Sequence, residues 1–129
     1  MPSQAAGAGT AWLARLSAAA EVPKQAVKRS SAHGTFEATL SGKKLTWKLT
    51  YAGLTGGATA AHIHMGANGK AGNVVVALCG GFPRCRSGLT GSAVLSTSLI
   101  SAFKRHLLYV NVHTTKNPLG EIRGQLQTQ

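Results

Sequence analysis

The 129-residue sequence predicts an all-β fold, an antiparallel Greek-key sandwich or barrel with one short helix. Two observations indicate this fold class. Short segments of alternating apolar and polar residues recur along the chain, separated by turns rich in glycine, proline and asparagine. Helical patterns are few: one short stretch lies near residue 100, and a second, ambiguous one covers residues 12–22. Many short strands with little helix are typical of sandwiches and barrels, and this length suffices for one domain with a buried core.

The N-terminal part of the chain contains a polar segment, an ambiguous segment and a loop. Residues 1–10 are small and polar and are predicted to form a disordered N-terminus, so that residues 11–129 make up the single β domain. Residues 12–22 combine good helix propensity with the extended exit expected before Pro23, so they are compatible with a helix or a strand. Residues 24–33 are polar and basic and are predicted to be a loop.

The clearest strand pattern predicts a hairpin over residues 35–51. Apolar residues alternate along 35–40, a turn follows at residues 41–43, and a longer alternation continues over 45–51. The residues assigned to the core in the second strand are Leu45, Trp47, Leu49 and Tyr51.

Four further strands are expected, over residues 59–65, 74–78, 107–114 and 122–126. The glycine-rich segment 66–72 lacks the helix that a phosphate-binding loop requires, so it is interpreted as a connection. Residues 79–92 are predicted to be irregular. Ser96 or Thr97 can cap a short helix over residues 98–106, with Leu99 and Phe103 on one face.

Two cysteines, Cys79 and Cys85, enclose a short glycine- and proline-containing loop. Such a loop allows its ends to approach, so a disulfide is expected, and it would place the protein in an oxidising compartment. The alternative is a pair of reduced thiols. No segment is long enough to span a membrane, and the start of the chain lacks a recognisable signal peptide. A secreted or periplasmic protein would therefore have had its signal peptide removed.

The charge balance is strongly basic, with 14 lysines and arginines against three glutamates. Such an excess attracts polyanions and is compatible with an acidic polymer or an acidic partner protein, but the scattered positions of the basic residues favour a solvated basic surface without a dedicated partner. The basic residues are scattered and aromatic residues are few, which argues against a specific nucleic-acid interface. No particular oligomeric state is predicted.

Three histidines are the main candidate functional residues. His62 and His64 are two positions apart in a predicted strand, so their side chains point to the same face. A third histidine, His113, ends another predicted strand. The apolar residues on the opposite faces of these strands are Ile63, Val110 and Val112. If those residues face the core, the three imidazoles lie on the outer side of the sheet, where they can meet at one metal ion if the strands are adjacent.

The charged residues beyond His113 have two interpretations. Glu121 and Arg123 share a strand face and can form an ion pair, or each can be a solvated charge next to a turn. Each histidine can likewise have a purely structural role as a hydrogen-bond donor to a carbonyl group. His106 is interpreted as a surface residue near a helix end.

Four segments together resemble the CHRD domain family, a module named after chordin and found in many exported bacterial proteins. The matching segments are residues 16–23 (LSAAAEVP), 61–66 (AHIHMG), 108–114 (LYVNVHT) and 117–126 (NPLGEIRGQL). The resemblance extends from about residue 13 to 127 and implies a small all-β domain. It also favours a strand over a helix for residues 13–22. Cys79, Cys85 and His33 depart from the family pattern.

At the level of the fold, the sequence is also analogous to the copper/zinc superoxide dismutases, which bind copper through strand histidines on the outer face of a barrel. His62, His64 and His113 would correspond to copper ligands. The chain contains no aspartate and no histidine-rich zinc loop, so neither the zinc site nor the activity is carried over.

The leading hypothesis is an exported domain that binds copper, or alternatively zinc, for copper handling or redox chemistry. Further ligand candidates are Met65, Glu21 and, ranked first, His33. The chain lacks paired carboxylates and an aspartate for a catalytic triad, so an enzyme here would be a copper-dependent oxidoreductase. The second hypothesis is a basic extracellular interaction module that binds an acidic polymer or partner protein, with structural histidines.

Overall fold

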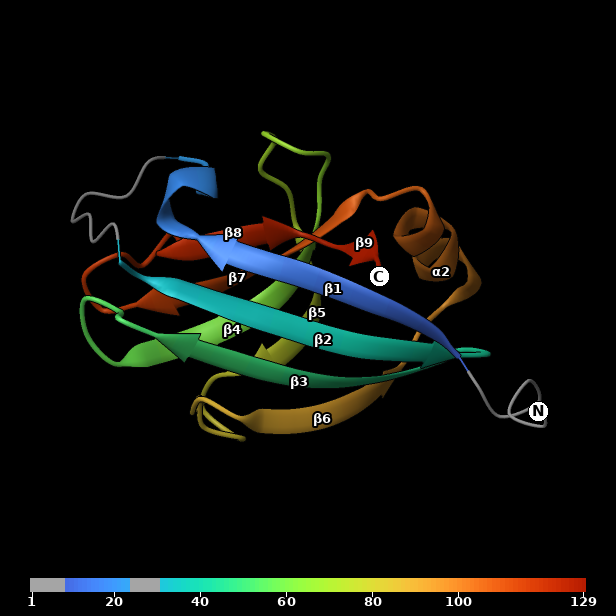
Figure 1. Cartoon of the computed structure of the whole chain (residues 1–129), viewed down its shortest axis with the longest axis horizontal. Coiled ribbons are helices and arrows are strands. Elements are labelled where there is room, and N and C mark those ends of the chain that lie inside the picture. The colour runs from blue at the N-terminus through green and yellow to red at the C-terminus, as the bar shows by residue number, and fades with distance from the viewer. Residues whose placement is uncertain (1–8, 24–30) are drawn as a thin grey trace.

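The structure, a computed structural model, describes residues 9–23 and 31–129 and consists of one antiparallel sheet that curls into a nearly closed barrel (Figure 1). The described part contains nine strands, a single-turn 3-10 helix η1 (Ala18–Ala20) and one α-helix, α2 (Thr97–Lys104). The strands are β1 (Thr10–Ser17), β2 (His33–Ser41), β3 (Lys44–Ala52), β4 (Ala58–Met65), β5 (Val74–Cys79), β6 (Leu89–Val94), β7 (Leu108–Thr114), β8 (Ile122–Gln125) and β9 (Gln127–Thr128). The predicted all-β class with one short helix is confirmed.

The strand order shows how the sheet closes on itself. The strands lie in the order β5-β4-β7-β8-β1-β2-β3-β6, and β9 pairs with β1. Strands β5 and β6 are therefore the two edges, and the chain passes from one edge to the other between residues 79 and 89. Cys79 and Cys85 form a disulfide within this connection, as predicted. The disulfide holds the start of the connection against the end of β5.

Strand β1 resolves the ambiguous N-terminal segment. Its alternation buries Trp12, Ala14 and Leu16, so residues 10–17 form a strand, as the family resemblance implied for residues 13–22. The strand ends at Ser17, however, and residues 18–20 form the 3-10 helix η1. Of the predicted disordered segment 1–10, residues 1–8 lie outside the described residues. Its last residue, Thr10, is instead the first residue of β1, because it pairs with Leu40 of β2.

Strands β2 and β3 form the predicted hairpin, with Ser41 opposite Lys44 at the turn. Of the predicted loop over residues 24–33, residues 24–30 lie outside the described residues. His33 is not in a loop, because it pairs with both Ser17 and Ala52 at the start of β2. Leu45, Trp47 and Leu49 are buried in the core, and Tyr51 packs against it.

Strand β6 was not predicted, because residues 79–92 lack a strong apolar alternation. It nevertheless pairs with β3 over six residues, from Leu89 opposite Leu49 to Val94 opposite Lys44. Gly91 lies beneath Trp47, where a Cβ atom would lie only 2.4 Å from the indole ring. A large tryptophan on β3 therefore requires a glycine on the neighbouring strand, and this glycine weakens the sequence pattern of β6.

Helix α2 lies beside one end of the barrel (Figure 1). The Ser96 hydroxyl caps its N-terminus by accepting a hydrogen bond from the Leu99 amide at 3.2 Å, as the sequence predicted. Phe103 is fully buried and packs edge-to-face on Trp12, with ring centroids 4.5 Å apart. The helix thus covers the apolar interior at this end of the barrel.

Candidate metal site

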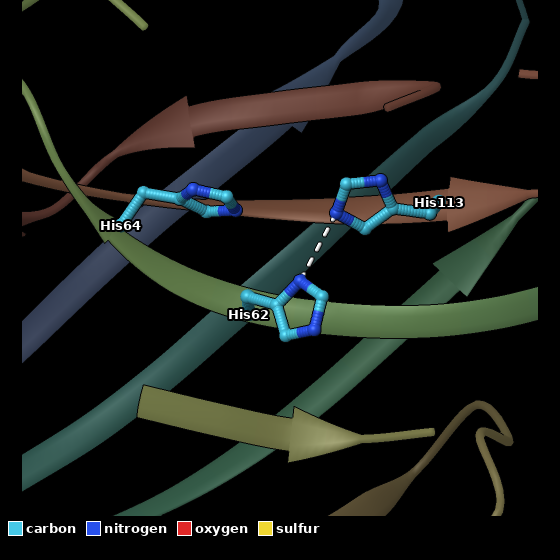
Figure 2. A group of neighbouring side chains, drawn as sticks. All are labelled: His62, His64 and His113. Atoms are coloured by element: carbon cyan, nitrogen blue, oxygen red, sulfur yellow. Dashed lines mark hydrogen bonds between the residues drawn. The ribbon is translucent and has the colours of Figure 1, made fainter. Parts of the chain in front are cut away.

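Strands β4 and β7 are neighbours, and they bring His62, His64 and His113 together on the outer face of the barrel (Figure 2). One nitrogen from each imidazole lies within 4.8 Å of the corresponding nitrogens of the other two. The predicted sidedness is confirmed, since the residues on the opposite face are fully buried: Ile63, Val110 and Val112. Strand alternation thus determines which face carries the histidines, and the β4–β7 pairing makes them adjacent.

The strand register determines which histidines meet. His62 lies opposite Asn111, and Ala60 lies opposite His113, so His62 and His113 are diagonal neighbours on one face. Ala60 has a small side chain, which leaves space for the His113 ring to lean toward His62. The resulting distance between His62 Nδ1 and His113 Nε2 is 3.1 Å.

Two backbone carbonyl groups determine the tautomers of His64 and His113. The Nδ1 atom of His113 lies 2.9 Å from the carbonyl oxygen of Pro118, and the Nδ1 atom of His64 lies 2.9 Å from that of Gly72. A carbonyl oxygen only accepts, so each Nδ1 donates its proton and each Nε2 carries a lone pair. The Nε2 atom of His64 is buried and has no hydrogen-bond partner. An unpartnered buried lone pair beside two other imidazoles fits a metal ion.

The spacing of the nitrogens is close to that of a metal site. Two ligands at about 2.0–2.1 Å from one metal are at most about 4.2 Å apart. The His62–His113 nitrogens are already within this limit, and the separations of up to 4.8 Å in the group have to shorten before all three nitrogens can reach one ion.

The surroundings favour the neutral, metal-binding form of two of the histidines. Burial lowers the pKa of His62, and the nearby His113 and His64 lower it further. Burial also lowers the pKa of His113, although the hydrogen bond to Pro118 opposes this effect. Both imidazoles therefore keep their lone pairs available to a lower pH than an ordinary histidine would.

The other predicted ligands lie elsewhere. His33 is exposed on β2, its Nδ1 atom lies 2.8 Å from the carbonyl oxygen of Ser31, and it is not part of the histidine group. Met65 packs against the core, because it follows His64 directly and so faces the opposite side. Glu21 is buried beside Gly120 and Asn111 rather than among the three imidazoles. Among the described residues, the group consists of His62, His64 and His113 alone.

A layer of loops covers the neighbouring polar residues of the same face. Arg123 is only 2% exposed, and its guanidinium donates to the carbonyl oxygens of Ala67 and Lys70 at 3.1 and 2.7 Å. The same group lies 3.4 Å from the centre of the Tyr109 ring. Tyr109 in turn stacks on His64, with centroids 4.8 Å apart and planes inclined by 5°. The loop over residues 66–72 is therefore attached to the sheet next to the histidines.

Glu121 is also fully buried, which contradicts its interpretation as a solvated charge. Its carboxylate accepts hydrogen bonds from the backbone and hydroxyl of Thr55, from Thr114 and from Asn117. These bonds lower the pKa of Glu121 in spite of its burial. Arg123 is not a solvated charge either, because it is buried and its guanidinium donates to the carbonyl oxygens of Ala67 and Lys70. Sequence reasoning missed this buried network, although the concentration of polar residues in 117–125 was a possible signal.

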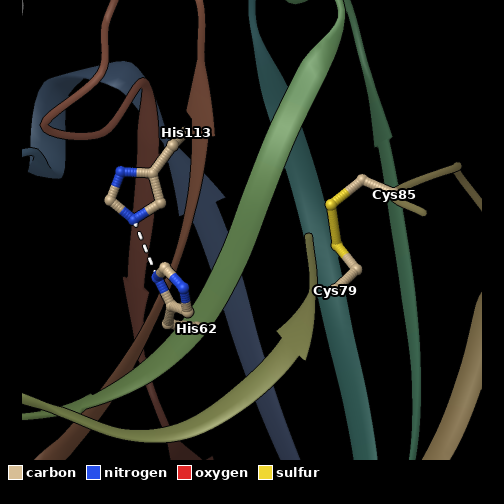
Figure 3. The surroundings of a disulfide bond; sticks show 4 residues. All are labelled: His62, Cys79, Cys85 and His113. Atoms are coloured by element: carbon tan, nitrogen blue, oxygen red, sulfur yellow. Dashed lines mark hydrogen bonds between the residues drawn. A yellow bond between two sulfur atoms is a disulfide. The ribbon is translucent and has the colours of Figure 1, made fainter. Parts of the chain in front are cut away.

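The disulfide lies on the other side of β4 from the histidines (Figure 3). Cys79 pairs with Ala61 across β4 and β5, and both residues face the core. His62, the next residue of β4, faces outward. The disulfide therefore supports the barrel from within, and the histidines occupy its outer surface.

The fold and the histidine group define a small antiparallel β-barrel domain with a potential metal site on its outer face. The chain belongs to the CHRD domain family, whose family model matches residues 3–126. No curated protein and no solved structure matches the chain. None of the described helices is long and apolar enough to cross a membrane. Membership of this family is consistent with an extracellular β domain, and the disulfide agrees with an oxidising environment.

Proposed function

We propose that this protein is an exported copper-binding domain that holds one copper ion through His62, His64 and His113. The observation that carries the proposal is the buried, unpartnered Nε2 atom of His64 beside two further imidazoles. A cation between the rings would give this buried lone pair a partner. The carbonyl partners of His64 and His113 supply the outer hydrogen bonds that usually orient metal-binding histidines.

The composition of the group favours copper over other metals. Three neutral imidazoles without a carboxylate or thiolate suit copper and zinc, whereas magnesium and calcium require oxygen ligands. Copper(II) binds nitrogen ligands more tightly than the other divalent ions of its series. Zinc is the alternative, and a competition titration distinguishes the two.

The site also has room for chemistry beyond storage. Three protein ligands leave one coordination position open, and His62 and His113 are only partly buried, so a small molecule can reach the ion. Copper bound there would supply one-electron redox chemistry. The role is therefore copper handling, redox chemistry or both, and the redox role would make the protein a copper-dependent oxidoreductase. The disulfide supports a secreted or periplasmic location.

The test is a copper titration of the metal-free protein with a competing chelator. The wild type is compared with a variant carrying His62→Ala, His64→Ala and His113→Ala, and with a control carrying His33→Ala and His106→Ala. We expect one copper per wild-type or control chain and loss of this binding in the triple variant. Binding in the wild type should weaken in acid, because a protonated imidazole cannot bind the ion, and the lowered pKa values of His62 and His113 move their part of this loss below the ordinary histidine value of about 6.5. Equal affinity in all three proteins would refute the site.

A second candidate function is binding to an acidic polymer, and the distribution of acids favours it. The chain has only three acidic residues, and two of them, Glu21 and Glu121, are buried. Glu37 is thus the one exposed acid among 14 lysines and arginines. Binding to heparin that falls steeply with added salt, and is unchanged in the triple histidine variant, would support this function. Absence of salt-dependent binding would exclude it.

A further inference from the structure

Tyr109 occupies a special position between the histidine group and the loop that covers it. It is 3% exposed, although it lies on the outer face of β7. Its ring is enclosed between His64 on one side and the guanidinium of Arg123 on the other. We infer that Tyr109 is a positioning residue, which acts with Gly72 and Arg123 to hold His64 in the tautomer that presents Nε2 to the metal. This inference rests on the proposed function.

The ring of Tyr109 fixes the plane of the His64 ring. The two residues are directly opposite each other in the β4–β7 pairing, so their side chains leave the same face side by side. The rings are nearly parallel, with an angle of 5° between their planes. A parallel stack restricts rotation of His64 about its side-chain bonds and so restricts the direction of its nitrogens.

The hydroxyl of Tyr109 fixes the hydrogen-bond partner of His64. The backbone amide of Gly72 donates to the Tyr109 oxygen at 3.0 Å, and the carbonyl oxygen of the same glycine accepts from His64 Nδ1 at 2.9 Å. A single residue therefore connects the tyrosine hydroxyl with the imidazole. Removing the hydroxyl leaves the ring stack intact, but it releases the amide that aims the Gly72 carbonyl at His64.

Arg123 anchors the rest of the same loop. It donates to the carbonyl oxygens of Ala67 and Lys70, and Gln125 donates to that of Gly66 at 2.8 Å. The path of the loop also depends on two glycines. A Cβ atom on Gly66 would lie 2.8 Å from the Tyr109 ring, and one on Gly72 would overlap the carbonyl oxygen of Met65. The loop thus has one tightly packed conformation, in which Gly72 reaches His64.

The consequence concerns the strength of metal binding. A neutral imidazole can carry its proton on either nitrogen, and the hydrogen bond made by one nitrogen decides which nitrogen is free to ligate. Loss of such an outer partner typically lowers metal affinity by about 10- to 100-fold. We therefore expect Tyr109→Phe to weaken copper binding by this factor, although the variant retains the ring and all three histidines.

The experiment has a metal-free readout and a metal-loaded readout. Nitrogen-15 NMR of the metal-free protein at pH 8 reports which nitrogen of each histidine carries the proton. In the wild type we expect His64 to be protonated at Nδ1 alone, and in Tyr109→Phe we expect a mixture of both tautomers. The control is Tyr51→Phe, which removes a tyrosine hydroxyl away from the histidines. A chelator competition titration then gives the copper affinity of the three proteins.

The outcomes separate the positioning role from the proposed function. A mixed tautomer together with a 10- to 100-fold weaker affinity in Tyr109→Phe supports the inference. An unchanged His64 tautomer, or a copper affinity within about twofold of the wild type, overturns it. If the wild type itself binds no copper, the proposed function fails, and the NMR result still decides whether Tyr109 sets the tautomer. If Tyr109→Phe does not fold, Arg123→Lys is used, and it should shift the same two readouts.

Discussion

Two outer faces of this barrel follow the same strand alternation and differ in what covers them. On the β2–β3 hairpin, the outward residues are solvent-exposed, as Glu37 and Lys48 show where they pair across the strands. On β4, β7 and β8, outward residues such as His64, Asn111 and Arg123 are buried. The difference lies in the loops over residues 66–72 and 115–120, which fold back over the second face. A polar sheet surface becomes a candidate site when connections exclude water from it.

The open face and the covered face also differ in how much their polar residues contribute to the free energy of unfolding. Exposed polar residues on β2 and β3 satisfy their hydrogen bonds with water, so each contributes little to the free energy of unfolding. The buried polar residues on β7 and β8 must satisfy theirs within the protein, so each depends on specific partners. The first two predictions below change the covered face and use the open face as reference, and two further predictions concern Glu21 and the disulfide.

The largest effect is expected for Arg123→Met. It removes the donor for the carbonyl oxygens of Ala67 and Lys70, and each orphaned carbonyl costs about 1–3 kcal/mol. We expect a loss of roughly 4 kcal/mol in the free energy of unfolding, measured by urea denaturation. Lys48→Met on the open face should change it by less than about 0.5 kcal/mol. Equal losses at the two positions would show that the covered face is not energetically distinct.

A comparison of two glycines tests the covering loop itself. In Gly72→Ala the new methyl group would overlap the carbonyl oxygen of Met65, and we expect a loss of about 3 kcal/mol. In Gly42→Ala, at the β2–β3 turn, the methyl group meets nothing within 4 Å, and only the positive φ of 60° opposes it. That strain is about 1–2 kcal/mol. Thermal denaturation compares the variants, and similar melting temperatures would contradict a tightly packed loop.

The pH dependence of stability is expected to report Glu21. Burial raises its pKa to about 8, although Arg123 opposes this shift, whereas the ordinary value is 4.5. Between these values the folded state binds more protons than the unfolded state, so Glu21 lowers the free energy of unfolding as the pH rises through this range. Glu21→Gln removes this term. Relative to the variant, the wild type should lose up to about 4 kcal/mol between pH 5 and pH 8.5, measured by urea denaturation.

If the free energy of unfolding changed with pH in the same way in the wild type and in Glu21→Gln, Glu21 would not be the source of this pH dependence. His62 and His113 contribute a term of opposite sign in both proteins, because their lowered pKa values make stability fall as the pH drops below about 6.5. Subtracting the stability of Glu21→Gln from that of the wild type at each pH cancels the histidine contribution.

The smallest effect is expected for the disulfide, which lies on the core side of β4. Cys79→Ser with Cys85→Ser opens a loop with a sequence separation of 6, and such a short loop stabilises by roughly 2 kcal/mol at most. Copper affinity should stay within about twofold of the wild type, because the two features occupy opposite sides of the strand. A large loss of affinity would mean that the two sides of β4 are coupled.

Alternation in the sequence was sufficient to predict which face of the sheet carries the histidines. The patterns in residues 59–65 and 107–114 predicted that Ile63, Val110 and Val112 face the core and the histidines face outward, and the structure agrees. Alternation has a period of two, so it determines the side of a strand from local residues alone. The disulfide was predictable for the same reason, since Cys79 and Cys85 are close in sequence.

Burial of the outward residues was not predictable, because it depends on contacts between distant segments. Arg123 is buried by a loop more than 50 residues away, and no local pattern encodes that contact. His33 was ranked first as a further ligand from its type, whereas the β1–β2–β3 pairing places it in a different part of the sheet. Strand adjacency determines both results, and it is a property of the whole fold.

His62 and His113 belong to adjacent strands but lie 51 residues apart in the chain. The segment between them contains β5, β6 and α2, so an ion held by both side chains would be a reversible cross-link around more than a third of the polypeptide. At a free metal concentration 100 times the dissociation constant, such a ligand stabilises the folded state by about 2.7 kcal/mol. Copper supply would then set how long each molecule survives proteolysis, and unloaded copies would be degraded first.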